Sequence, residues 1–107
     1  MNTSVINPAW VEDALQGGQD GVAQLYHATC QDVYLAIRSA AELDEDTAMN
    51  LMQDTFVKAF THLEQLDTPA RFPEWITGIA LTTASDYLAQ ENKAIRADFR
   101  RSSRNFG

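Results

Sequence analysis

Apolar residues recur at intervals of three and four along most of the chain, which is the spacing of one face of an α-helix. Runs in which apolar and polar residues alternate, as they do in half-buried strands, are missing from the 107 residues. We therefore predict an all-α fold, a compact bundle of four helices.

Capping residues and glycines predict where the first three helices begin and end. The first has Asn7 as its N-cap and Pro8 at its first position, and it ends before the glycines at positions 17 and 18. The second begins after Asp20 and runs to about Ala41. The acidic segment 42–46 supplies a cap for the third helix and suits the positive end of its dipole.

Each predicted helix carries an apolar stripe for the core. Two prolines, Pro69 and Pro73, exclude a helix through them and leave one long loop over residues 66–73. The fourth helix begins at Pro73 and continues past Lys93 as its pattern fades. The stripes are Ala9, Trp10, Ala14 and Leu15 in the first helix, Val22, Leu25, Tyr26, Cys30, Val33, Tyr34 and Ile37 in the second, Ala48, Leu51, Met52, Phe56, Ala59, Phe60 and Leu63 in the third, and Trp75, Ile76, Ile79, Ala80, Ala84, Tyr87 and Leu88 in the fourth.

Composition and charge place this bundle in a single acidic domain. With 45% hydrophobic and 21% charged residues, the chain has the composition of an ordinary globular protein and can bury a core without disulfides or bound metals. Residues 1–92 hold fourteen acidic and three basic side chains, whereas the last fifteen residues hold five basic and one acidic. We expect a folded domain over residues 1–95 and a flexible basic extension over residues 96–107. The acidic body favours basic protein surfaces, and the basic end could touch phosphates.

The sequence offers no chemistry for an enzyme. No nucleophile and base, carboxylate pair or ligand set stands out, so we expect no catalytic residues, no metal and no cofactor. His27 and Cys30 could share an ion, but two ligands make no structural zinc site, and a core cysteine beside a half-exposed histidine is the favoured alternative. The chain has no eighteen-residue apolar run, no signal peptide and one cysteine, so we expect a cytoplasmic protein without a membrane partner.

Phe72 lies in the proline-containing loop next to Arg71 and has two interpretations. Its ring and the adjacent guanidinium could offer a stacking surface to a nucleic-acid base. Alternatively, the ring packs the loop onto the third helix. From the residues alone, packing is the favoured interpretation of the two.

Two strings of residues carry a family resemblance. Residues 46–60 read Asp-Thr-Ala-Met-Asn-Leu-Met-Gln-Asp-Thr-Phe-Val-Lys-Ala-Phe, and residues 72–80 contain Phe-x-x-Trp-Ile-x-x-Ile-Ala. Together with a Gly-x-Asp turn at residues 18–20, they resemble region 2 of a bacterial RNA polymerase sigma factor of the sigma-70 family. More narrowly, they resemble the extracytoplasmic-function group. The resemblance extends from about Trp10 to Lys93.

This resemblance implies a transcription initiation module that binds core RNA polymerase, at the clamp coiled coil of its largest subunit, and contacts the melted minus-ten promoter strand. Asn50, Gln53 and Asp54 match the positions that face the clamp. The loop from residue 66 to 72 matches the segment that cradles a base flipped from single-stranded promoter DNA. The implied DNA-binding positions are Lys58, Arg71, Phe72, Trp75, Thr82, Asp86, Lys93, Arg96 and Arg100.

The departures from the family pattern leave a second function open. Asn50 follows Met49 where the family has Glu-Asp, Thr82 stands where an asparagine is typical, and residues 89–91 read Ala-Gln-Glu where the family runs into Arg and Lys. A weaker DNA face would suit a protein-interaction adaptor on the same fold that binds polymerase or an anti-sigma factor and no DNA. The region 4 domain of the family does not occur within these 107 residues.

Overall fold

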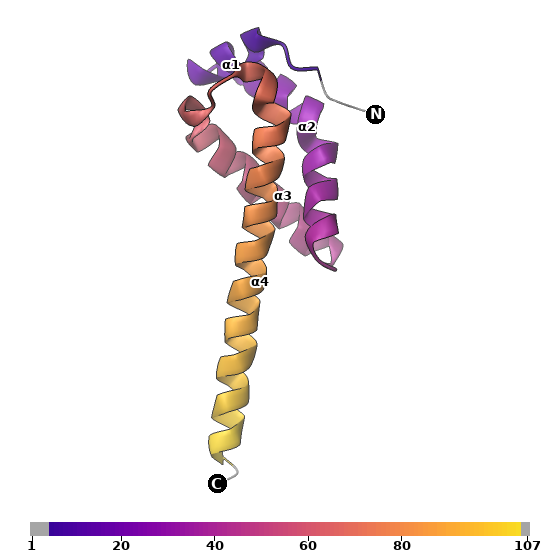
Figure 1. Cartoon of the computed structure of the whole chain (residues 1–107), viewed down its shortest axis with the longest axis vertical. Helices are drawn as coiled ribbons and strands as arrows, with labels where there is room; N and C mark the ends of the chain where they lie inside the picture. Colours follow the sequence, from indigo (N-terminus) through magenta and orange to yellow (C-terminus); the bar gives the residue numbers. More distant parts are fainter. Residues whose placement is uncertain (1–4, 106–107) are drawn as a thin grey trace.

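The chain was described from a computed structural model, which gives the backbone of residues 5–105 and the side chains of residues 5–95. Within these residues it has four α-helices, two short 3-10 turns and no strand, so the all-α prediction is confirmed (Figure 1). The elements are α1 (Pro8–Leu15), α2 (Gln19–Ala40), α3 (Glu45–Thr61), η1 (Leu63–Gln65), η2 (Pro69–Arg71) and α4 (Phe72–Asn105).

The first two helices are joined by a tight turn that the sequence predicts well. The Asn7 side chain accepts a hydrogen bond from the Ala9 N–H at 3.0 Å, as expected of an N-cap. Gly17 has φ of 85°, a backbone conformation that favours glycine. A hydrogen bond closes the turn: the N–H of Gly21 donates to the Asp13 carboxylate at 2.7 Å. A Cβ atom on Gly21 would overlap the Trp10 carbonyl oxygen, so α1 can cross α2 closely only at a glycine.

The core lies where the apolar stripes of α2, α3 and α4 meet, and α1 covers one side of α2 (Figure 1). Most residues of the predicted stripes are buried or half-buried, but Ala9, Leu15 and Tyr26 are exposed. Three threonines that the stripes do not include are buried as well. Each donates its hydroxyl hydrogen to the carbonyl oxygen four residues earlier, which removes the cost of burying it. These residues are Thr29, Thr55 and Thr83.

A row of aromatic rings runs through the core from α2 to the start of α4. The ring centroids are 4.7 Å apart for Tyr26 and Phe56, 6.0 Å for Phe56 and Phe60, and 6.2 Å for Phe60 and Phe72. The row ends with Phe72 and Trp75 at 6.0 Å. All four separations lie in the range at which aromatic pairs attract. The row therefore ties the first turn of α4 to the interior of the bundle.

The segment between α3 and α4 is more ordered than the predicted loop. Two 3-10 turns, η1 and η2, leave only residue 62 and residues 66–68 without helical structure, and α4 begins at Phe72 rather than at Pro73. Pro73 fits the second position of the helix because N–H groups in a first turn have no helical partner to lose.

The last helix extends well beyond the bundle. The chain measures 63 × 29 × 22 Å, and Figure 1 shows the second half of α4 projecting away from the other helices. The prediction that the fourth helix continues past Lys93 is confirmed. Residues 96–107 were expected to form a flexible extension. The structure continues α4 through them as far as Asn105, and their flexibility stays a prediction.

Burial of Phe72 predicts a large effect on stability. Phe72→Ala should lower the free energy of unfolding by about 3–5 kcal/mol, because it removes a ring that has no exposed surface. Phe72→Leu should cost less, about 1.5 kcal/mol, since it keeps most of the apolar volume. Urea denaturation followed by circular dichroism measures both. A loss below about 1 kcal/mol for Phe72→Ala would contradict the core position.

Candidate functional site

The outer face of α3 carries the polar residues that the sequence singles out. Asn50, Gln53 and Asp54 are all exposed, whereas Leu51, Met52 and Thr55 between and beside them are buried. Positions 50, 53 and 54 follow the spacing of one helical face. The prediction that these three side chains lie off the core stripe is confirmed.

Val57 is a further residue of this face, and sequence reasoning missed it. It lies three positions after Asp54, and its exposed fraction is 66%. An exposed valine in a row of polar groups is apolar surface that a partner could cover. The helical spacing already places Val57 on this face, since position 57 continues the series 50, 53 and 54. We call these four residues, Asn50, Gln53, Asp54 and Val57, the outer face of α3.

The start of α3 is set by a cap that holds this face in place. The Asp44 carboxylate accepts a 2.8 Å hydrogen bond from the Thr47 N–H, and the Arg38 guanidinium donates to the Leu43 carbonyl oxygen at 2.7 Å. Hydrogen bonds from Thr47 lower the pKa of the Asp44 carboxyl below its ordinary value of 3.8, and the charge of Arg38 lowers it further. The cap is therefore stronger when Asp44 is ionised.

The segment between α3 and α4 borders a small hollow of about 180 Å³, which we call the loop hollow. Its walls combine an aromatic ring with polar groups of both charges. Half-buried Trp75 forms the aromatic part. The lining residues are Gln65, Leu66, Asp67, Thr68, Arg71, Glu74 and Trp75.

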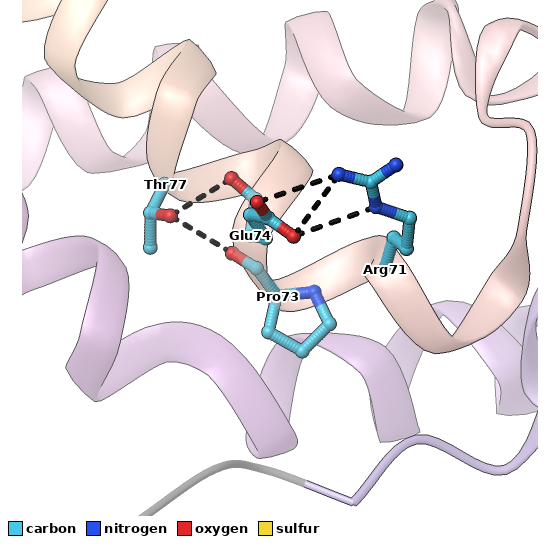
Figure 2. Close-up of polar contacts among 4 residues, drawn as sticks. All are labelled: Arg71, Pro73, Glu74 and Thr77. Atoms are coloured by element: carbon cyan, nitrogen blue, oxygen red, sulfur yellow. Dashed lines mark hydrogen bonds and ion pairs between the residues drawn. The ribbon is translucent and has the colours of Figure 1, made fainter.

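An ion pair occupies one wall of the loop hollow (Figure 2). The Nε atom of Arg71 lies 3.4 Å from a carboxylate oxygen of Glu74, and its Nη2 atom lies 3.5 Å from both oxygens. Both side chains are well exposed, so the pair adds little stability. The Thr77 hydroxyl donates to the carbonyl oxygens of Pro73 and Glu74 and holds the first turn of α4 beneath this pair. The exposed guanidinium of Arg71 is thus paired with Glu74.

The structure places one predicted contact residue, Phe72, in the core. Phe72 has no exposed surface and lies between Phe60 and Trp75 in the aromatic row. The alternative in which its ring packs the loop onto α3 describes it, and in this structure no part of the ring is exposed. The physical reason is its place at the first residue of α4, where the core begins. Trp75, three residues later, is the aromatic ring that lines the hollow.

The remaining predicted contact residues lie mainly along one line of α4. Trp75, Thr82, Asp86 and Lys93 are separated by seven, four and seven residues, so they share one helical face. Thr82, Asp86 and Lys93 are exposed. Lys58 of α3 is also exposed and contacts α4 at Thr83. Arg96 and Arg100 lie outside the residues whose side chains are described.

The described part of the chain holds neither a metal-ligand cluster nor a membrane-spanning helix. Side chains of His, Cys, Asp and Glu form no cluster there that could hold a metal ion. Cys30, three residues from His27, is half-buried against the core. None of the described helices has the length and hydropathy needed to cross a membrane.

Comparison with protein families assigns the fold. The family model for sigma-70 region 2 matches residues 25–94, which include most of α2, all of α3 and the first two thirds of α4. The chain therefore belongs to the sigma-70 region 2 family, whose members act in transcription initiation. Comparisons with curated proteins and with solved structures gave no match.

The cap of α3 predicts a pH dependence of stability. Asp44→Asn keeps an oxygen that can accept from Thr47 but removes the charge. Because the pKa of Asp44 is lowered in the folded chain, its extra stabilisation is present above the ordinary pKa and is lost as the pH falls through the folded pKa. The wild-type chain should therefore unfold at higher urea than Asp44→Asn at neutral pH. This difference should shrink from about pH 5 towards pH 3, and a difference that grows on acidification would contradict the assignment.

Proposed function

We propose that this chain is a transcription initiation module of the extracytoplasmic-function group. In this proposal the outer face of α3 binds the clamp coiled coil of core RNA polymerase. The loop hollow and α4 contact the melted, single-stranded minus-ten promoter DNA. This function places the chain in the cytoplasm, and an anti-sigma factor is a further partner. The observation that carries the proposal is the exposed polar face at residues 50–57, in the part of the chain that the family model matches.

The outer face of α3 has the chemistry of a protein-binding surface. Asp54 supplies a negative charge, Asn50 and Gln53 supply amide groups, and Val57 supplies apolar area. Complementary charge guides a partner to such a face and sets its register. A basic coiled coil fits it better than nucleic acid does, because a phosphate backbone is repelled by a carboxylate.

The loop hollow and the line along α4 have the chemistry expected for a single strand. An indole ring accepts any base by stacking, which is worth about 1–3 kcal/mol per base. The polar groups around Trp75 could bond to the edge of that base. The net charge of the chain is −7, and charges beyond about 8 Å are largely screened at physiological salt. Local contacts to phosphates can therefore outweigh the repulsion from the rest of the domain.

The exposed residues Ala89, Gln90 and Glu91 on α4 favour the alternative adaptor function. They place an acidic group where a DNA-binding helix would carry cations. An adaptor would bind polymerase or an anti-sigma factor through α3 and would show no affinity for single-stranded DNA. Measuring binding to a promoter oligonucleotide at low salt separates the two functions.

The polymerase contact predicts a clear effect of two substitutions. Gln53→Ala and Asp54→Ala should each weaken binding to the isolated clamp coiled coil, and the double variant should do so by about tenfold or more. Isothermal titration calorimetry measures the change. Gln24→Ala and Glu12→Ala, which remove comparable exposed groups from α2 and α1, are the matched controls and should bind normally. If all five variants bound with the affinity of the wild type, the assignment of this face to polymerase would be wrong.

The ion pair in the loop hollow predicts that one carboxylate weakens DNA binding. Glu74→Gln should free Arg71 for a phosphate and so increase affinity for a single-stranded oligonucleotide several-fold at low salt. The slope of log affinity against log salt should steepen by about 0.7, which corresponds to one phosphate contact.

Fluorescence anisotropy measures the affinity and slope of this variant. Glu42→Gln removes the same charge from the connection between α2 and α3, away from the hollow, and is the matched control. The same gain in both variants would show a general charge effect and would contradict a specific role of the pair.

A further inference from the structure

A second hollow lies next to the loop hollow, between the end of α3 and α4. Its volume is about 370 Å³, and it shares two wall residues, Gln65 and Trp75, with the loop hollow. The complete lining is Lys58, His62, Gln65, Trp75 and Ile79. Because Trp75 lines both spaces, the two hollows are neighbours on the surface.

The charges of the two hollows differ. The loop hollow combines Arg71 with two carboxylates, those of Asp67 and Glu74. In the second hollow the charged lining residue is Lys58, and none of the described residues that line it is acidic. A phosphate is therefore favoured in the second hollow, whereas an uncharged base edge suits the mixed groups of the first.

Lys58 is held in position by a chain of hydrogen bonds. Its Nζ atom donates to the Thr83 hydroxyl oxygen at 3.2 Å, and that hydroxyl donates to the Ile79 carbonyl oxygen at 2.8 Å. Thr83 is buried, so this acceptor cannot turn to water. An ammonium group has three donors, and the contact with Thr83 uses one, which leaves two for a phosphate. A cation that is already ordered loses less conformational freedom on binding.

His62 is the second donor that this hollow offers. It lies four residues after Lys58 at the C-cap of α3, and its backbone N–H donates to the Lys58 carbonyl oxygen at 3.1 Å. Residues at this spacing lie on the same side of a helix. The exposed imidazole has at least one N–H donor in either protonation state. Two donors from adjacent turns thus border one space.

We propose that this second hollow is a phosphate subsite for single-stranded nucleic acid. Lys58 and His62 bind the backbone phosphate next to the base that stacks on Trp75, and Thr83 is a positioning residue for Lys58. The inference deepens the proposed DNA-binding function and rests on it. It adds His62 to the contact residues and Thr83 as the residue that positions Lys58, and it gives Lys58 a specific partner, a phosphate.

The test uses the full chain and a fluorescein-labelled single strand of about twelve nucleotides. Anisotropy gives the affinity at several salt concentrations for Lys58→Gln, His62→Ala and Thr83→Val. Lys58→Gln should weaken binding by about fivefold at low salt and flatten the salt slope by about 0.7. His62→Ala should weaken binding in the same direction.

Thr83 provides the matched pair of variants. Thr83→Val removes the hydroxyl at nearly constant volume, and Thr83→Ser keeps it. Thr83→Val should weaken binding by about twofold to threefold without a change in salt slope, because the charge of Lys58 remains. Thr83→Ser should bind as the wild type does. Circular dichroism melting confirms that each variant is folded before its affinity is compared with that of the wild type.

A fluorescence signal separates failure of this inference from failure of the proposed function. In a Trp10→Phe background, Trp75 is the sole tryptophan, and its quenching reports a base on the shared wall. If the parent chain shows neither quenching nor a change in anisotropy at low salt, the DNA-binding function and the subsite are both wrong. If the parent binds with quenching, while Lys58→Gln and His62→Ala keep its affinity and salt slope, only the phosphate subsite is wrong. If Thr83→Val and Thr83→Ser bind equally, Thr83 does not position Lys58.

Discussion

Burial of the Phe72 ring against Phe60 is the contact on which the arrangement of the functional surfaces depends. It fixes where α4 begins and thereby places Arg71 just before the helix and Trp75 one turn inside it. The loop hollow exists because these residues are held by a packed core rather than by the loop itself. The ring itself has no exposed surface, and it holds the neighbouring residues in place.

The same helix serves the core and the proposed partner with opposite faces. In α3, Leu51 and Phe56 are buried while Gln53 and Asp54 are exposed, and the separation follows from 3.6 residues per turn. The end of α3 then contributes Lys58 to a different surface, beside α4. One helix thus connects the proposed polymerase contact to the proposed DNA contact. Movement of α3 on polymerase binding would change the geometry of the second hollow.

Capping residues and periodicity predicted the helices, whereas the site depends on contacts between helices that the sequence pattern does not give. Asn7 and Asp44 marked two helix starts because capping depends on neighbours within three residues. Periodicity also separated the exposed outer face of α3 from its core face. It could not show that Thr83 meets Lys58, twenty-five residues earlier. Helical spacing states which face a residue occupies and not which helix it meets, so it also could not show that Lys58 and His62 border a space next to α4.

The central claim is that the outer face of α3 binds the coiled coil of polymerase. The most direct measurement is the change in amide NMR chemical shifts when the isolated clamp coiled coil is added to labelled chain. The account predicts that the largest changes fall on Asn50, Gln53, Asp54 and Val57. Binding that shifts the amides of α1 or the second half of α4 and leaves α3 unchanged would contradict it.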